Sequence, residues 1–310
     1  MMKIIDKILS LEHFREQPPV VIDIGASGAI HEAWKPIARY AVCLAFDADD
    51  REFTVAEDAT GSGYRKLLRF NRIVTAMPKE SAPFYLTASP FCSSLLEPEA
   101  AKLEPWVFSA LFKVEKTVNL PAMTITQALQ QAGIHYIDWF KADTQGTDLQ
   151  LFLSLDVKVR QNVLACEFEP GIIDAYRGED KLFTIMGTMK EEGFWLSSMQ
   201  VKGTQRLHRE YVAQLGADPK NLLRESPCWA ELAYLHEASI DSERQYLLLM
   251  VFALLQEQYG FVLELCDAAG LKYKNPIFDT VRAAVLKQLK KRRFAVPLII
   301  IKRKLRKLFR

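Results

Sequence analysis

The sequence predicts an α/β fold: a mostly parallel sheet with helices on both faces, followed by an α-helical C-terminal appendage. Short apolar runs at 20–24 and 41–46 stop abruptly at loops rich in Gly or Asp, which is typical of buried parallel strands. Segments of helical periodicity alternate with such runs, which indicates βαβ units. Beyond about residue 205, helical periodicity takes over.

The elements follow in order. Residues 3–16 predict a short amphipathic helix that Pro18-Pro19 ends. Strands are expected at 20–24, 41–46, 72–76, 84–87, 114–120, 136–142, 162–168 and 194–199. Helices are expected at 30–39, 125–131, 147–154, 179–192, 242–259, 261–269 and 277–291. This pattern predicts one domain over residues 1–205 and a helical region over 206–310.

The composition is that of a globular protein, with 310 residues of which 49% are hydrophobic. The five cysteines are scattered and form neither a CxxC pair nor a cluster with zinc spacing, which favours a reducing compartment. The N-terminus has no apolar core of signal-peptide length, and the longest apolar run, 294–301, is too short to span a bilayer. We therefore expect a cytoplasmic protein.

The last segment, 287–310, is strongly basic. It holds eleven of the 40 Lys and Arg residues and no acid, and the rest of the chain carries 29 basic residues against 38 acidic ones. Leu298, Ile301, Leu305 and Leu308 fall at helical spacing among these charges, which predicts a basic amphipathic helix. Peripheral contact with the inner face of an anionic membrane and docking on the acidic body remain equal alternatives. Nucleic acid is less favoured because aromatic residues for base stacking are sparse.

The first strand ends at the loop Asp23-Ile24-Gly25-Ala26-Ser27-Gly28. Gly25 and Gly28 allow the backbone to approach a ligand closely, although they could also simply make a tight turn. A dinucleotide fingerprint would require glycine at position 23 as well. Asp23 would repel a pyrophosphate, but it suits a cationic ligand such as S-adenosylmethionine. The candidate residues for binding that cofactor are therefore Asp23, Gly25, Ala26, Ser27 and Gly28.

The second strand ends at Asp47, 24 positions beyond Asp23. An acidic residue at this place can accept hydrogen bonds from both ribose hydroxyls of a nucleoside. Asp49 and Asp50 are close rivals for this role. A helix N-cap is the structural alternative, and it is compatible with ribose binding.

Two later strands carry candidate catalytic residues. Lys141 and Asp143 are two positions apart at the end of one strand, and the alternation of side chains predicts that they share a face. Glu167 and Glu169 are related in the same way on the next strand. A pair of carboxylates at a strand end is costly unless it is solvated or paired, which marks a candidate site. Capping of the following helix is the alternative for Asp143.

These segments, in this order, resemble the FkbM family of methyltransferases that use S-adenosylmethionine. The resemblance covers about residues 20–200, and 137–149 is its most specific part. The matching segments are 21–28, 45–49, the serine-rich loop 92–96, 124–129, 137–149, 165–169 and 193–196. It implies a class I methyltransferase fold, which is Rossmann-like, and transfer of a methyl group to a hydroxyl of a saccharide, glycan or related small molecule.

On this basis we expect Asp143 or Glu167 to act as the general base or to orient the acceptor. Lys141 would position an anionic acceptor or organise the site. Ser93, Ser94, Gln145 and Glu169 are the candidate acceptor-binding residues. His31, His135 and His208 are further candidate bases, although single histidines are more often structural.

A metal-free site is preferred to a divalent metal held by Asp143 and a glutamate, because no cluster of ligands supports the metal. Two other classes of function stay open. One is an NAD(P)-dependent oxidoreductase, and the other is a non-catalytic binding protein on the same scaffold.

Overall fold

A computed structural model describes residues 1–26, 30–48, 63–237 and 240–308, with side chains as far as residue 293. The chain divides into two compact units. The first, which we call the sheet unit, is Pro18–Ser239. The second, the helical unit, combines Met1–Gln17 with Ile240–Arg310.

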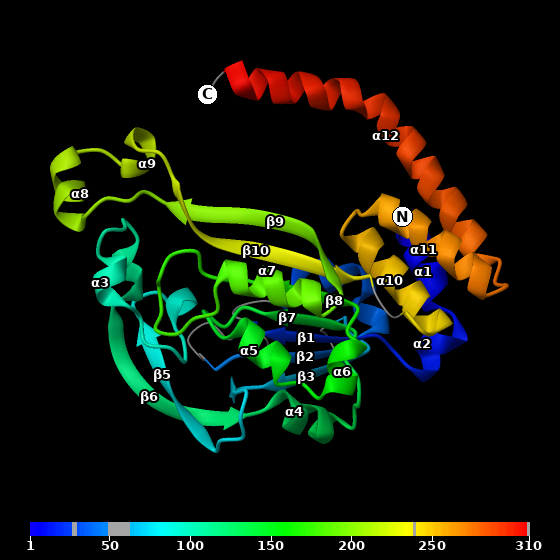
Figure 1. Cartoon of the computed structure of the whole chain (residues 1–310), viewed down its shortest axis with the longest axis horizontal. Helices are drawn as coiled ribbons and strands as arrows, with labels where there is room; N and C mark the ends of the chain where they lie inside the picture. The colour runs from blue at the N-terminus through cyan, green and yellow to red at the C-terminus, as the bar shows by residue number, and fades with distance from the viewer. Residues whose placement is uncertain (27–29, 49–62, 238–239, 309–310) are drawn as a thin grey trace. The chain divides into compact units, whose positions relative to one another are not determined.

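The sheet unit is built on a seven-stranded sheet of order β3-β2-β1-β7-β8-β10-β9 (Figure 1). Strand β10 is antiparallel to both of its neighbours, and the other pairings are parallel. The strands are β1 (Val20–Ile24), β2 (Val42–Phe46), β3 (Lys66–Phe70), β7 (Trp139–Ala142), β8 (Ala165–Phe168), β9 (Phe194–Thr204) and β10 (Ser226–His236). The order of the strands changes direction between β1 and β7. The carboxyl ends of these two strands therefore form a topological switch point.

Both faces of this sheet are covered. On one face Phe140, Phe152 and Phe168 pack together with apolar side chains of three helices, α4 (Ile125–Ala132), α5 (Asp148–Leu153) and α7 (Leu182–Glu191). On the other face lies the 3-10 helix η1 (Glu32–Tyr40), whose Trp34 ring meets Trp139 edge-on at 5.9 Å. The fully buried strands β1 and β2 explain why their sequences are continuously apolar.

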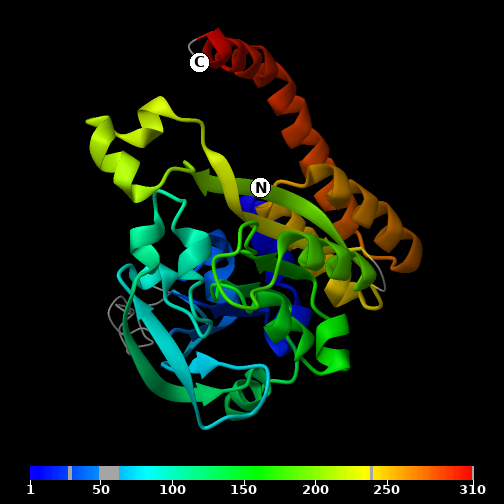
Figure 2. The same cartoon turned by 60° about the vertical axis from the view of Figure 1, so that its left-hand side comes forward.

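A second, three-stranded sheet has the order β4-β6-β5. It consists of β4 (Ile73–Val74), β5 (Ser81–Thr87) and β6 (Val114–Met123), and Figures 1 and 2 show β6 as a long, curved strand beside β5. Between β5 and β6 lie η2 (Pro90–Cys92), α3 (Ala100–Leu103) and η3 (Ser109–Phe112). The remaining elements of the sheet unit are α6 (Val157–Gln161) and, between β9 and β10, α8 (Arg209–Leu215) and α9 (Pro219–Leu222).

The helical unit contains α1 (Met2–Leu9), α2 (Glu12–Glu16), α10 (Glu243–Leu255), α11 (Tyr259–Lys272) and α12 (Ile277–Leu308). Helix α10 begins at a capping box in which Ser242 and Gln245 exchange hydrogen bonds. Helix α12 includes the basic segment that begins at residue 287, as far as Leu308. Among the residues described, no helix combines the length and the apolar character that a membrane crossing requires.

The α/β class and the mostly parallel sheet are confirmed, but two predictions about the elements differ from the structure. The third parallel strand is β3, at Lys66–Phe70, and the expected strand at 72–76 shrinks to β4 in the second sheet. Strand β10 lies in the region predicted to be helical, because the chain returns to fill the place between β8 and β9. The sheet unit therefore extends past residue 205, and the first helices group with the C-terminal ones.

Candidate functional site

A cavity of about 470 Å³ opens at the carboxyl ends of the strands in the sheet unit. Its lining includes one residue that follows each of four neighbouring strands: Asp47 after β2, Gly25 after β1, Asp143 after β7 and Glu169 after β8. In an open α/β sheet, ligands bind at this edge and at the switch point. The volume is in the range of small-molecule sites.

The floor of the cavity is a close contact between two backbone segments. Gly25 has φ +86°, and a Cβ atom at this position would lie 2.0 Å from the carbonyl oxygen of Asp143. The N–H of Asp143 in turn donates to the carbonyl of Ile24, and the N–H of Gly25 donates to Phe46, both at about 3 Å. Only glycine fits here, because both the dihedral angle and the space exclude a side chain.

The turn after β7 is held by a dense set of hydrogen bonds. Gln145 adopts a left-handed backbone (φ +57°), and its side chain donates to Asp143 Oδ1 at 2.9 Å. Ser94 donates to the carbonyls of Thr144 and Gln145 from outside the cavity. A non-glycine residue in this conformation is strained, and such strain is typical of functional sites.

Three carboxyl groups meet at this turn. Asp148, at the start of α5, accepts the N–H of Thr144 and the N–H of Glu169, and so ties the ends of β7 and β8 together. Burial, reinforced by the charge of Asp143, raises the pKa of Asp148 to about 7. The same causes raise the pKa of Glu169 to about 9, and Glu169 hydrogen-bonds to Asp143. Glu169 therefore carries a proton at neutral pH, and Asp143 accepts it in a hydrogen bond.

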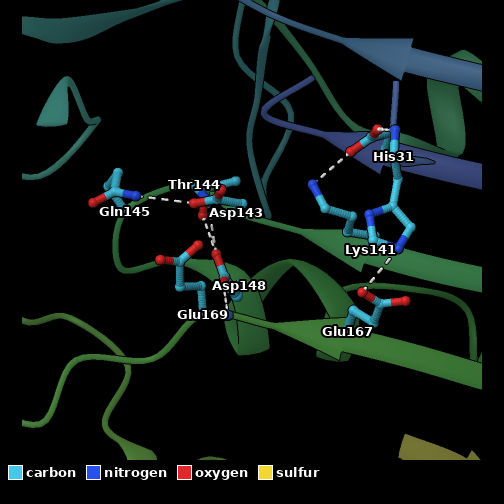
Figure 3. Close-up of polar contacts among 9 residues, drawn as sticks. His31, Lys141, Asp143, Thr144, Gln145, Asp148, Glu167 and Glu169 are labelled. Atoms are coloured by element: carbon cyan, nitrogen blue, oxygen red, sulfur yellow. Dashed lines mark hydrogen bonds and ion pairs between the residues drawn. The ribbon is translucent and has the colours of Figure 1, made fainter. Parts of the chain in front are cut away.

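A second polar group crosses the sheet as a row of paired residues. Asp23 on β1 lies beside Lys141 on β7, which lies beside Glu167 on β8. Asp23 is fully buried, and its carboxylate accepts from Lys141 Nζ and from the His31 N–H, each at 2.8 Å. Glu167 contacts the His31 ring nitrogen Nε2 at 3.2 Å. We call Asp23, Lys141, Glu167 and His31 the charged row. Figure 3 shows His31, Lys141 and Glu167 as a group separate from Asp143, Gln145, Asp148 and Glu169.

Electrostatics favour the charged form of Lys141. Burial alone would lower the pKa of the Lys141 ammonium, but the surrounding carboxylates, Asp23 first, raise it above its ordinary value. A buried pair of this kind fixes the geometry of the strands it joins. The His31 contacts extend this anchoring to the far end of the loop that follows β1.

The structure brings together some of the predicted site residues and separates others. Those that line the cavity are Gly25, Asp47, Ser93, Asp143, Gln145 and Glu169. Those that lie outside its lining are Asp23, Ala26, Ser94, Lys141 and Glu167, and also His31, His135 and His208. Ser27, Gly28 and Asp49 are outside the described residues.

The contacts of the charged row bear on two of these expectations. Asp23 lies outside the cavity lining, and its carboxylate accepts hydrogen bonds from Lys141 and His31. Lys141 and Glu167 also lie outside the lining, whereas Asp143 and Glu169, two positions further along the chain, belong to it.

Two cavity residues, Glu179 and Trp229, and the neighbouring Asp148 escaped the sequence interpretation. Glu179 is buried against the N–H groups of Ala175 and Tyr176, and Trp229 belongs to the unpredicted strand β10. Asp148 belongs to the motif 137–149, but its sequence position predicts only an acidic residue in the first turn of a helix. The alternating pattern of β10 was the available signal for Trp229.

Among the residues described, no three His, Cys, Asp or Glu side chains form a group that could hold a metal ion. No protein-family model matches the chain, and no curated protein matches it in sequence. The sheet order and the cavity therefore carry the functional argument.

The contact at Gly25 can be tested against a matched glycine. Gly133 also has a left-handed backbone (φ +68°), but a Cβ there meets nothing within 4 Å. We expect Gly133→Ala to cost about 1–2 kcal/mol of unfolding free energy. Gly25→Ala should cost clearly more, because it adds the clash with Asp143. Urea unfolding followed by circular dichroism measures both, and equal losses would contradict the close contact.

The buried ion pair predicts a large effect of removing its cation. Lys141→Met leaves the Asp23 carboxylate buried and uncompensated, which should cost about 3–5 kcal/mol of unfolding free energy. Lys35→Met is the control, because the Lys35–Glu32 pair is exposed and should change stability by less than about 1 kcal/mol. Asp23→Asn combined with Lys141→Met should recover part of the loss. A Lys141→Met variant as stable as the control would rule the pair out as an anchor.

The raised pKa of Glu169 predicts a pH dependence of stability. The unfolded chain releases this proton near pH 4.5, whereas the folded protein holds it until about pH 9. Stability contributed by the neutral form is therefore lost as the pH rises from about 5 to 9. Glu169→Gln should melt at a progressively higher temperature than the wild type across this interval. The exposed Glu191→Gln is the control, and a constant difference for Glu169→Gln would contradict the shift.

Proposed function

We propose that the protein is a methyltransferase that uses S-adenosylmethionine to methylate a hydroxyl group of a small molecule. One observation carries the proposal: the cavity lies at the switch point of a sheet in which the antiparallel strand β10 stands between β8 and β9. Of the FkbM-like segments, 21–28, 45–49, 137–149 and 165–169 include the strand ends that line this cavity, and 92–96 adds residues from the segment between β5 and β6.

The strand order distinguishes two nucleotide-binding folds. A dinucleotide-binding sheet has six parallel strands in the order 3-2-1-4-5-6. Here β3-β2-β1-β7-β8 follow that order, but an antiparallel strand separates the fifth strand from β9. An antiparallel last strand at this place is the mark of the class I methyltransferase sheet, which the resemblance implies.

The cavity fits the chemistry of the cofactor. S-adenosylmethionine supplies a methyl group on a positively charged sulfur, and an oxygen nucleophile displaces the sulfur, which keeps the electrons of the broken bond. Asp47, at the end of β2, is in the place from which a carboxylate accepts hydrogen bonds of ribose hydroxyls. Gly25 leaves room for close approach, and Asp143 offers negative charge to a cationic ligand.

Asp143 is the residue that we assign as general base. It lines the cavity, whereas Glu167 faces His31. Glu169 is protonated at neutral pH, so the neighbouring Asp143 is the member of the pair that can accept the hydroxyl proton. Gln145 fixes the orientation of the Asp143 carboxylate.

We assign to Lys141 the second of its two expected roles, that of organising the site, and we assign the same role to Glu167 in place of that of general base. Both belong to the charged row, which holds β1, β7 and β8 in register and anchors His31. They act as positioning residues of the cofactor loop and do not touch the acceptor.

The assignment of Asp143 is tested by Asp143→Asn. Transfer of labelled methyl groups to a panel of phenols, alcohols and sugars should fall by at least about 100-fold, because proton transfer to the base is lost. Binding of labelled S-adenosylmethionine, measured by equilibrium dialysis, should stay within a few-fold of the wild type. Asp156→Asn, at the exposed N-cap of α6, is the control. Retained turnover would remove Asp143 as the base.

A further inference from the structure

The cavity has two ends of different chemistry. Its β2 side is lined by Asp47, Ala48, Ile73 and Phe84, beside the small core that Ile73 forms with Ala82 and Ala122. Its β10 side is lined by six large apolar or aromatic residues, which we call the aromatic chamber: Phe91, Phe108, Leu111, Phe112, Tyr176 and Trp229. Because β10 neighbours β8 and β2 neighbours β1, Asp143 and Glu169 stand between these two ends along the sheet edge.

The rings of the chamber brace one another. Phe108 stacks on Trp229 with centroids 6.2 Å apart and planes 11° from parallel. Phe108 meets Phe112 edge-on at 5.0 Å, and Phe112 meets Tyr176 at 5.6 Å. Such pairs hold rings in defined orientations, so the chamber is preformed.

The polar groups at the edge of the chamber already have partners. The Tyr176 hydroxyl lies 2.8 Å from the carbonyl oxygen of Cys92 and 3.2 Å from Gln145 Oε1. Ser93 Oγ accepts the N–H of Thr87. A polyhydroxylated ligand would therefore bury hydroxyls without hydrogen-bond partners, which costs free energy. An apolar ring has no hydroxyl groups to bury, so it does not incur this cost in free energy.

The chamber is also apolar at its outer limit. Phe91 and Leu111 line the cavity although they are 59% and 46% exposed. Large exposed apolar side chains at the rim of a cavity are typical of a binding site for an apolar ligand.

We infer that the acceptor is an apolar ring compound with its hydroxyl at one end, of the phenol type, and not a bare saccharide. The ring lies in the aromatic chamber, and the hydroxyl reaches Asp143. In the transfer the acceptor oxygen forms a bond to the methyl carbon, the carbon–sulfur bond breaks with its electrons going to sulfur, and Asp143 takes the hydroxyl proton. This inference rests on the proposed methyl transfer, but binding of an apolar ring in the chamber can be tested separately from the transfer.

The test measures binding of 2-naphthol and of methyl glucoside to the full-length protein by calorimetry. We expect 2-naphthol to bind one-to-one and at least about tenfold more tightly than the glucoside. The double variant Phe91→Ala with Leu111→Ser changes only exposed side chains and should weaken naphthol binding by about tenfold. The matched control, Phe183→Ala with Leu271→Ser, removes exposed apolar side chains outside the cavity and should leave binding unchanged.

Trp229→Leu gives a second readout, because loss of the stacked ring should also weaken naphthol binding. Equal binding of naphthol and glucoside, or equal affinities of the double variant and its control, would overturn the inference. A protein that binds S-adenosylmethionine but not naphthol would contradict the inference alone. A protein that binds naphthol in the chamber but not S-adenosylmethionine would uphold the chamber and contradict the proposed function.

Discussion

The site depends on the contact between the backbone after β1 and the backbone after β7. At Gly25 the two segments approach so closely that a single added carbon would collide with the Asp143 carbonyl. This contact brings the loop after β1 and the proposed base to the same edge of the sheet. The strand order reverses between the same two strands, and the ligand crevice of such a sheet opens where the order reverses.

The charged row makes that contact rigid. Asp23 and Lys141 join the same two strands, two residues before Gly25 and Asp143 respectively. Glu167 extends the pairing to β8, and His31 extends it to the residue that follows the loop after β1. A buried ion pair contributes little net stability, but it fixes which arrangement of the strands is allowed. Lys141 and Glu167, which the sequence offers as catalytic groups, thus belong to this row and lie outside the cavity lining.

Local patterns predicted the parts of the site that lie on continuous segments. The apolar run before Gly25, the acid after β2 and the motif 137–149 gave the first loop, Asp47, Asp143 and Gln145 from the sequence. Side-chain alternation grouped Lys141 with Asp143 and Glu167 with Glu169, but it could not show that Lys141 and Glu167 pair with Asp23 and His31 and lie outside the cavity lining. The place of β10 in the sheet and the aromatic chamber could not be predicted, because Trp229 and Phe108 meet only after the chain returns across the sheet. Long-range pairing of this kind leaves no local signal beyond an alternating pattern.

We propose that the cavity binds S-adenosylmethionine and not a dinucleotide. Titration calorimetry of the full-length protein with S-adenosylmethionine and with NAD(H) tests it most directly, with Asp47→Ala as the site variant. The proposed function predicts one-to-one binding of S-adenosylmethionine, a clear loss of affinity in Asp47→Ala, and no binding of NAD(H). Binding of NAD(H) alone, or of neither ligand, would contradict it.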